Sequence, residues 1–398
     1  MRVCLLFQSD FPPEPRLART AKALLELGHE VSLFCDNRNE RPHDENLDGL
    51  KVRRVSHASI RPDALKQVLR LPIFWNPVWC AQFFAFVRAG RFDAIHAINL
   101  TMAPLAWLTA RRFGLHFVYD MYEPYPDALR SWQLTSMFDR VFRNATAAEL
   151  LDRRCLRAAD HVIVVVEEAM DYVLHMGVLP KKISVIQNVP DTQALLAQPV
   201  DDTILQRYDQ CFTIVYTGMV GNERGLDTVV AGMMELKNRI PESRLVIVGG
   251  GPHEGHLREL ARKLSVEPWV EFTGWTDHRM FATYIRAADV CIVPQPANPY
   301  VDKTLPNKLF DYMALGKPVV VSDAKPLARI VRACDCGEVF TSESPESFVE
   351  AVLAVKTRLH EAGHNGEQAV ANQYNWRLAS RNLAEVYARL SATPSTAS

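Results

Sequence analysis

The sequence predicts an α/β protein with two doubly wound parallel-sheet domains that face each other across a cleft. Three observations favour this fold. The chain has 398 residues, which suggests two domains rather than one. Short apolar segments alternate with longer helical ones, as in βαβ units. This alternation stops at a polar segment, 194–210, and then starts again.

The first half of the chain contains the elements of the first domain. Apolar segments predict strands at 3–7, 31–34, 52–55, 94–96, 117–119, 162–166 and 183–186. Helical segments separate most of them, at 15–28, 78–89, 102–113, 145–158 and 168–176. We assign these elements to an N-terminal domain at 1–193, followed by a linker at 194–210.

The same alternation then returns in a second domain at 211–375. We expect its strands at 212–216, 245–248, 270–272, 290–293 and 318–321, and its helices at 225–238, 254–265, 277–286, 306–314 and 346–360. A last helix at 376–390 is expected to cross back to the first domain, and the polar tail at 391–398 to be disordered. Ligands of such sheets bind beyond the carboxyl ends of the strands.

The segment 306–323 carries the clearest functional signal. Pro306 suits the first turn of a helix, and a buried strand follows a Gly-Lys-Pro turn. Asn307, Lys308 and Asp311 fall together on the polar side of this helix. A cation, an amide and a carboxylate at a helix start can bind phosphate and hydroxyl groups together. A sugar nucleotide has this chemistry, with its diphosphate at Lys308 and its ribose at Asp311.

Loops after other strands of the second domain add candidates. Gly218 and Gly221 would let the backbone approach a phosphate, and Arg224 adds a forked donor for two phosphate oxygens. A plain βα turn with a solvated arginine is an equally good interpretation. Gly250 lies in a tight turn that is not a G-x-G-x-x-G fingerprint. Trp275 follows a strand exit whose free backbone groups could read a base edge, but the ring could equally pack in the core.

The first domain has no Gly-rich phosphate loop, so we expect it to bind the acceptor. Asp10 and Arg16 lie in or after the loop that follows the first strand, and Glu123 follows the strand at 117–119. Each could contact an acceptor or sugar hydroxyl. A capping or surface role for Glu123 is an equally good interpretation.

Composition and missing motifs argue against other classes. The formal net charge of −1 gives no basic excess for nucleic acid. The scattered cysteines form no C-x-x-C or zinc pattern, so we expect reduced thiols and a cytoplasmic protein. No P-loop or G-x-S-x-G motif occurs. No Asp-x-Asp pair or cluster with metal-ligand spacing is seen, so we expect no metal or other cofactor, with Arg224 and Lys308 neutralising a leaving diphosphate.

The opening residues are typical of a core strand rather than a signal peptide, and no apolar run is long enough to span a membrane. The nearest approach is 71–87, which is rich in Trp and interrupted by Pro72 and Pro77. A buried helix with its loop and an interfacial patch on anionic lipid both stay open. The second interpretation adds a peripheral contact with the inner face of a membrane.

Taken in order, these segments resemble the retaining, nucleotide-sugar-dependent glycosyltransferases of the GT-B architecture, which have two Rossmann-like domains. The resemblance is to family 4, with its glycosyltransferase group 1 domain, and it runs from 2 to about 390. The matching text is LARTAKALLELGHEV, YDMYE, the loop from Gly218 to Gly225, LVIVGGGP, VEFTGW, AADVCIVP and PNKLFDYMALGKPVVVSD. The resemblance implies that Arg224 and Lys308 hold the diphosphate, and that the loops at Gly250 and Trp275 frame the base.

Three departures from the family pattern concern the same site. The family has two glutamates eight positions apart, and here these positions hold Lys303 and Asp311. The usual contact with the donor sugar would then be missing or supplied by Asp302. The common Gly-Arg pair has Met219 in place of the arginine, and the histidine of Tyr-Asp-x-His-Glu is Tyr122.

The resemblance implies a retaining, hexosyl-type glycosyltransferase. It would move a sugar from a UDP- or GDP-type donor to a hydroxyl of a glycan or lipid-linked acceptor, in cell-surface polysaccharide assembly. Two alternatives stay open. One is a sugar-nucleotide 2-epimerase on the same fold, which needs more catalytic carboxylates than the sequence offers. The other, which Lys303, Met219 and Tyr122 keep open, is a catalytically impaired pseudo-glycosyltransferase that binds a partner transferase or a glycan.

Overall fold

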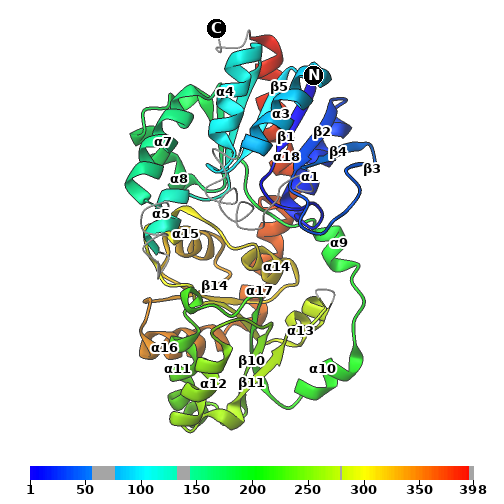
Figure 1. Cartoon of the computed structure of the whole chain (residues 1–398). Helices are drawn as coiled ribbons and strands as arrows, with labels where there is room; N and C mark the ends of the chain where they lie inside the picture. The colour runs from blue at the N-terminus through cyan, green and yellow to red at the C-terminus, as the bar shows by residue number, and fades with distance from the viewer. Residues whose placement is uncertain (56–76, 132–143, 278–279, 394–398) are drawn as a thin grey trace, which may run out of the picture. The chain divides into compact units, whose positions relative to one another are not determined.

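The computed structural model describes residues 1–55, 77–131, 144–277 and 280–393 (Figure 1). The chain divides into two compact units. Unit 1 consists of Met1–Gln187 and Ala379–Ser398, and unit 2 consists of Asn188–Leu378. Each unit is built on one sheet with helices on its faces. The predicted pair of doubly wound α/β domains is therefore confirmed.

Unit 1 contains a sheet in the order β3-β4-β2-β1-β5-β6-β7-β8. Its strands are β1 (Arg2–Leu6), β2 (Glu30–Cys35), β3 (Asp44–Leu47), β4 (Leu50–Arg54), β5 (Ala94–Ile98), β6 (His116–Met121), β7 (His161–Val164) and β8 (Ile183–Val185). All neighbours pair in parallel except β3 and β4, which form an antiparallel hairpin. The sequence did not predict β3, which is mostly polar and has no buried residue.

The helices of unit 1 lie between these strands along the chain. They are α1 (Pro15–Glu26), α3 (Pro77–Gly90), α4 (Ala103–Phe113), α5 (Tyr125–Ser131), α7 (Ala145–Ala158) and α8 (Glu167–His175). The last helix, α18 (Trp376–Ala392), belongs to unit 1 from Ala379 onward. Its Tyr387 hydroxyl lies 2.9 Å from Nδ1 of His96, and Asn382 donates to the carbonyl of Val185. These bonds connect the end of the chain to β5 and β8.

Helix α3 is the described part of the Trp-rich segment, and 71–76 lies outside the described residues. Trp79, Phe83 and Val87 recur at helical spacing and are buried. The rings of Trp79 and Phe83 both contact Phe34 of β2 edge to face. This face of α3 is therefore part of the core of unit 1, as expected for a buried helix. Within the described residues, no helix is both long and apolar enough to cross a bilayer.

Unit 2 contains an all-parallel sheet in the order β11-β10-β9-β12-β13-β14. Its strands are β9 (Phe212–Thr217), β10 (Ser243–Val248), β11 (Val270–Gly274), β12 (Val290–Val293), β13 (Val319–Ser322) and β14 (Gly337–Phe340). Every residue of β9, β12 and β13 is buried, which explains their continuous apolar runs. The sequence did not predict β14, which has only two buried residues.

The helices of unit 2 complete the fold. They are α9 (Thr192–Leu196), α10 (Asp202–Tyr208), α11 (Leu226–Arg239), α12 (Glu254–Lys263), α13 (Phe281–Ala287), α14 (Lys308–Ala314), α15 (Lys325–Cys334), α16 (Pro345–Lys356) and α17 (Leu359–Asn372). The core of the unit joins α11, α12 and α16 to the apolar side chains of β9 and β10. Each fully buried aliphatic side chain there contributes about 1.5–3 kcal/mol of hydrophobic stabilisation.

The segment expected as a linker, 194–210, is part of unit 2 and is largely helical. Asp191 and Asp201 each accept a backbone N–H bond at the start of a helix, α9 and α10 respectively. Helix α10 then packs on α13, and the Tyr208 ring lies 6.4 Å from the Tyr284 ring. The polar composition that suggested a linker reflects capping residues and exposed helix faces.

Candidate functional site

The candidate donor site lies where the strand order of unit 2 changes direction. The chain passes from β9 to β10 and β11 on one side, and then returns to β12 on the other side of β9. Ligands of open α/β sheets bind beyond the carboxyl ends of the strands at such a point. The loops that leave β9, β10 and β11 contain Gly218, Gly250 and Trp275, so the fold brings these predicted residues to one edge of the sheet.

The loop after β9 closely approaches the loop after β12. Gly225 has φ of 71°, and a Cβ atom added there would lie 2.0 Å from the carbonyl oxygen of Pro294. No side chain fits that space, and the left-handed backbone itself favours glycine. Gly225 therefore lets the turn that carries Arg224 lie directly against the exit of β12.

The loops after β9 and β10 are packed equally closely. A Cβ atom on Gly249 would lie 2.1 Å from the carbonyl oxygen of Gly218, and one on Gly251 would lie 2.3 Å from that of Val220. Val220 also donates a backbone hydrogen bond to Gly250, and it accepts one from His253. Gly249 and Gly251 are thus required by contacts between two backbones, whether or not a phosphate binds beside them.

Lys308, the first residue of α14, reaches across to the end of β9. Its Nζ lies 3.7 Å from the centroid of the Tyr216 ring, and a Cβ atom on Gly218 would lie 3.1 Å from that nitrogen. The lysine is half-buried and forms no ion pair with any described carboxylate. Burial lowers the pKa of Lys308 well below its usual value, and repulsion by Arg224 lowers it further, partly offset by Asp311.

Arg224 ends the short 3₁₀ turn Asn222–Arg224. Its Nη1 lies 3.5 Å from Oε1 of the buried Gln295, and its Nε pairs with Glu223 at 3.1 Å. Glu223 is 52% exposed, and an ion pair so open to water contributes only about 0–1 kcal/mol. A phosphate could replace that carboxylate at little cost.

Arg224 and Lys308 therefore lie close enough to repel each other, beside a loop of closely packed glycines. Two cations that are partly removed from water favour a ligand with several negative charges, since each would gain a charge-assisted hydrogen bond. A diphosphate is such a ligand. The structure brings these two predicted residues together, but their role stays a prediction.

Asn307 directly precedes Lys308, and Asp311 follows it one turn later on α14. Asn307 is exposed and precedes the helix, and Asp311 is partly exposed in the first turn. The helix was expected from 306, but it begins at Lys308 and has only seven residues. We therefore base the anion site on side chains rather than on the helix dipole of α14. The hydroxyl of Tyr312 accepts the backbone N–H bond of Thr217, which fixes α14 to the end of β9.

The other two predicted loops differ in character. A Cβ atom on Gly250 would lie 2.8 Å from the Trp275 ring, and that ring is 69% exposed. Trp275 thus presents an open aromatic face beside a glycine, which suits stacking with a base, and it is not a core residue. Gly221 is less constrained, because a Cβ atom there would meet only the flexible end of Glu223.

Asp302, the suggested substitute for the missing glutamate, already has a local partner. One carboxylate oxygen accepts the backbone N–H of Lys325 at 3.0 Å, and the other lies 3.5 Å from the Lys325 ammonium. These contacts satisfy the start of α15. Lys303 donates to the carbonyl of Pro299. Any contact of Asp302 with a donor sugar would have to replace the bonds to Lys325.

The candidates in unit 1 have different surroundings. Asp10 accepts the backbone N–H bond of Arg38 at 2.5 Å, and Glu123 is partly exposed after β6. Arg16 is only 2% exposed, and its guanidinium donates to Asp120 at 3.1 Å and to the carbonyl of Ile186 at 2.9 Å. The structure therefore does not support direct acceptor binding by Arg16, since the side chain is buried and both of its Nη atoms already donate inside unit 1, whereas its buried Nε has no partner among the described residues.

Arg16 belongs to a buried polar cluster. Its guanidinium also lies over the Tyr122 ring, 4.4 Å from the centroid, so the tyrosine that replaces the family's histidine contacts it. His96 lies 3.2 Å from the second oxygen of Asp120. Charges buried this deeply need such partners, and removing one leaves the other unpaired. We infer that the cluster stabilises unit 1.

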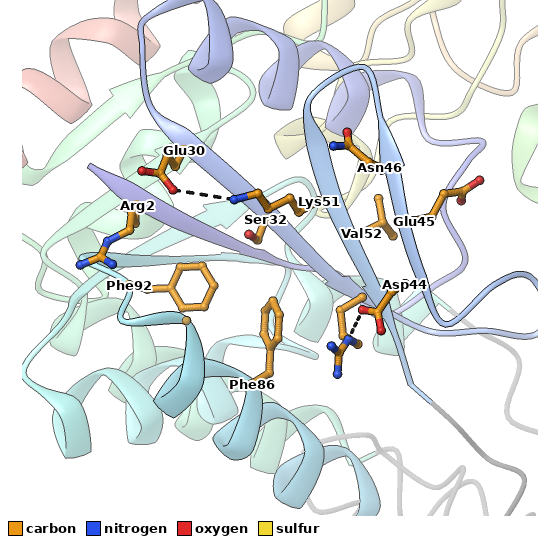
Figure 2. A pocket seen from close by; sticks show the side chains of 12 residues that line it. Arg2, Glu30, Ser32, Asp44, Glu45, Asn46, Lys51, Val52, Phe86 and Phe92 are labelled. Carbon is orange, nitrogen blue, oxygen red and sulfur yellow. Dashed lines mark hydrogen bonds and ion pairs between the residues drawn. The ribbon is translucent and has the colours of Figure 1, made fainter.

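Unit 1 contains a cavity of about 510 Å³, and Figure 2 shows the side chains that line it. Arg2 and Glu30, the first residues of β1 and β2, line it together with Phe86 and Phe92. It therefore opens near the amino ends of the central strands, whereas Asp10 and Glu123 follow carboxyl ends. Lys51 bridges to Glu30 at 3.8 Å across its wall. We assign it no part in the candidate site.

Sequence reasoning missed several residues that shape the donor site. Tyr216 lies beneath Lys308, Gln295 lies beside Arg224, and Tyr312 fixes α14. The signal for the first two was their place near strand ends: Tyr216 lies two residues before Gly218, and Gln295 lies two residues after β12. Asp227, His253 and His256 were also missed, although His-x-x-His is visible in the sequence. The sequence shows no complete cluster at metal-ligand spacing, because Asp227 joins the two histidines only in the fold. The expectation that no metal binds stays a prediction.

Comparisons with known proteins agree with this architecture. The model described as "Glycosyl transferases group 1" matches residues 211–357, and the "Glycosyl transferase 4-like domain" model matches 13–189. "D-inositol 3-phosphate glycosyltransferase 2" of Catenulispora acidiphila is 24% identical over 393 residues, which cover 94% of this chain and 88% of that protein.

Solved structures share the fold. Sucrose-phosphate synthase from Thermosynechococcus elongatus superposes with a TM-score of 0.78 at 20% identity, covering 98% of this chain and 100% of the other. HepE of Anabaena, solved with UDP and glucose, gives 0.73 at 13% identity, with the same coverage. The two family matches together span most of the chain, one on each sheet. The protein therefore belongs to the group 1, family 4 type of glycosyltransferases and has the GT-B fold.

Proposed function

We propose that this glycosyltransferase takes its sugar from a nucleoside diphosphate donor, of the UDP or GDP type, that binds to unit 2. The observation that carries the proposal is the place of two basic side chains at the switch point of the sheet, with Arg224 in the turn after β9 and Lys308 over the ring of Tyr216 in β9. The diphosphate would accept hydrogen bonds from both. Asp311 would bind the ribose hydroxyls, and Trp275 would stack on the base. The structure of HepE with UDP and glucose supports a donor of this kind on the same fold.

In the proposed reaction, the bond between the sugar and the β-phosphate oxygen breaks, and a bond from the acceptor oxygen to the same carbon forms. Negative charge grows on the leaving diphosphate, and Lys308 and Arg224 stabilise it. The acceptor proton passes to a donor phosphate oxygen. We expect the hexosyl group to be transferred with retention, and without a metal ion at the diphosphate, because the two cations supply the neutralising charge.

We propose a hydroxyl of a glycan or of a lipid-linked sugar as the acceptor, in cell-surface polysaccharide assembly at the cytoplasmic side of a membrane. This part rests on the family resemblance. Asp10 and Glu123 follow β1 and β6 of unit 1, at the carboxyl ends where such sheets bind ligands. They are the residues of unit 1 that we expect to contact that acceptor.

The test is donor binding measured by isothermal titration calorimetry with UDP and GDP and their sugars. Lys308→Met removes the ammonium and keeps most of the side-chain volume. It should weaken binding about 10- to 100-fold, as expected for the loss of a charge-assisted hydrogen bond of about 1.5–3 kcal/mol. Turnover should fall about 100- to 1,000-fold, because the lost donor acts on a developing charge.

Lys317→Met is the matched control. Lys317 is also half-buried, and burial also lowers its pKa, but it precedes β13 at the amino end of the sheet near Asp289. The Lys317→Met variant should bind the donor with the affinity of the unaltered protein. Equal affinity of both variants would refute the assignment of Lys308. Absence of any nucleotide binding would instead favour the pseudo-glycosyltransferase, and donor turnover without an acceptor would favour the epimerase.

A further inference from the structure

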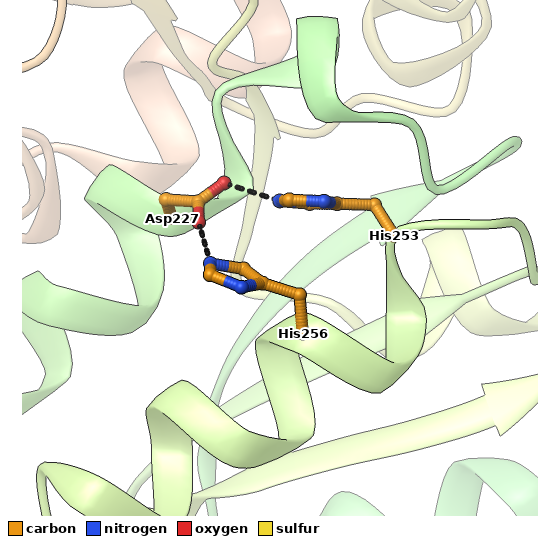
Figure 3. A group of neighbouring side chains, drawn as sticks. All are labelled: Asp227, His253 and His256. Carbon is orange, nitrogen blue, oxygen red and sulfur yellow. Dashed lines mark hydrogen bonds and ion pairs between the residues drawn. The ribbon is translucent and has the colours of Figure 1, made fainter.

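We propose that Asp227, His253 and His256 bind a divalent transition metal, such as Zn²⁺. Figure 3 shows the three side chains gathered between α11 and α12. Asp227 is the second residue of α11, His253 directly precedes α12, and His256 lies in the first turn of α12. Because residues three apart on a helical turn share a face, the two imidazoles project toward the same carboxylate. The inference does not depend on the proposed donor.

The distances are already close to those of a coordination shell. Nε2 of His253 lies 2.8 Å from one oxygen of Asp227, and Nε2 of His256 lies 2.8 Å from the other. The two rings are stacked, with centroids 4.5 Å apart. In a tetrahedral Zn²⁺ site with bonds of about 2.0–2.1 Å, ligand atoms lie about 3.3 Å apart. Opening the cluster by about half an ångström would therefore make room for the ion.

The donor set fits a transition metal rather than Mg²⁺ or Ca²⁺. Imidazole nitrogens suit Zn²⁺, Co²⁺, Ni²⁺ and Cu²⁺, whereas Mg²⁺ and Ca²⁺ prefer oxygen ligands throughout. Each neutral imidazole can move its proton from Nε2 to Nδ1, so both Nε2 atoms become ligands without a change in net charge. The carboxylate supplies the third ligand and one negative charge. Water can complete the site, because His256 is 56% exposed and Asp227 is 38% exposed.

The position of the cluster gives the metal a structural consequence. Asp227 lies two residues after Gly225, and the backbone N–H of His253 donates to the carbonyl of Val220. A bound ion would connect the starts of α11 and α12, and thereby the loops after β9 and β10. We expect it to stabilise unit 2 and to hold these two loops in one arrangement.

The test uses the full chain, freed of metal with a chelator, then titrated with Zn²⁺ by calorimetry and with Co²⁺ by visible absorption. We expect one equivalent to bind, with the absorption of tetrahedral Co²⁺ and a rise in melting temperature on addition of Zn²⁺. The double variant His253→Gln, His256→Gln keeps hydrogen-bond donors beside Asp227 but removes both imidazole nitrogens that would bind the metal. This variant should lose at least about 100-fold in Zn²⁺ affinity, and Asp227→Asn at least about tenfold.

The matched control is His360→Gln with His364→Gln. These histidines are exposed on α17 in the same unit, and their i, i+4 spacing could itself bind a metal weakly. The control should keep the tight equivalent and its Co²⁺ spectrum. The proposal is overturned if the control loses that equivalent, or if the unaltered protein binds Zn²⁺ no more tightly than the variant without His253 and His256. Either result would show that the cluster serves only as hydrogen bonds between two helices.

Discussion

Gly225→Ala tests the close contact between the loop of Arg224 and the exit of β12. The added methyl group would lie 2.0 Å from the carbonyl oxygen of Pro294, and the residue would keep a φ of 71°. The left-handed backbone alone costs about 1–2 kcal/mol for alanine, partly offset because alanine loses less entropy on folding. The clash adds to this, since the backbone must move by more than an ångström. We expect a total loss of stability above about 3 kcal/mol.

Gly274→Ala is the control that separates the two contributions. Gly274 has nearly the same φ, 70°, but an added Cβ atom would meet nothing within 4 Å. The Gly274→Ala variant should lose only about 1 kcal/mol of stability, because it has the same left-handed backbone cost without the clash. A difference of about 2 kcal/mol in a unit of this size corresponds to about 4–8 °C in melting temperature.

The assay is thermal unfolding of both variants, followed by circular dichroism, together with UDP binding at a temperature where both are folded. Gly225→Ala should melt well below Gly274→Ala and should bind UDP more weakly, because Arg224 moves with the loop. Equal melting temperatures of the two variants would refute the close approach of Gly225 to Pro294.

Three further predictions use other parts of the structure. Burial and Arg224 lower the pKa of Lys308, so at this residue the unfolded chain binds a proton more readily than the folded protein does. The melting temperature without ligand should therefore rise as the pH increases from the lowered pKa toward the usual pKa of lysine. Lys308→Met should flatten this rise, and an unchanged pH profile of the variant would contradict the lowered pKa. Asp120→Asn should lower the free energy of unfolding by about 3–5 kcal/mol, measured with denaturant, because the buried Arg16 loses its carboxylate partner. A decrease below about 1 kcal/mol would contradict a buried ion pair. Trp275→Ala should change the free energy of unfolding by less than about 0.5 kcal/mol, because the ring is exposed. It should still weaken nucleotide binding by about 1–3 kcal/mol, and unchanged affinity in calorimetry would exclude stacking on the base.

The fold and the donor loops were predictable because their signals are local. Buried parallel strands appear as short apolar runs, and glycines directly after them mark loops that approach other groups closely. Both patterns can be recognised within about ten residues of chain. Lys308 and Arg224 stand out for the same reason, as cations next to such loops. Elements with weak local signals were missed, such as β3, three of whose four residues are polar, and β14, which is short.

The remaining features depend on contacts between distant residues. Arg16 looked like a free cation near a strand end, but the fold buries it against Asp120, 104 positions away. Asp302 is a candidate substitute for a missing glutamate, and in the fold it accepts the backbone N–H bond of Lys325, 23 positions away. Asp227 meets His253 across 26 positions. One sequence does not show which distant residues pair, so these roles became visible only in three dimensions.

The most direct test of the account is a crystal structure of the protein with a UDP- or GDP-sugar that it binds in solution. We predict that Nζ of Lys308 and a guanidinium nitrogen of Arg224 both lie within about 3.2 Å of diphosphate oxygens, with Trp275 facing the base. A diphosphate held by other residues, with Lys308 still against Tyr216 and Arg224 still paired with Glu223, would contradict the proposed donor site.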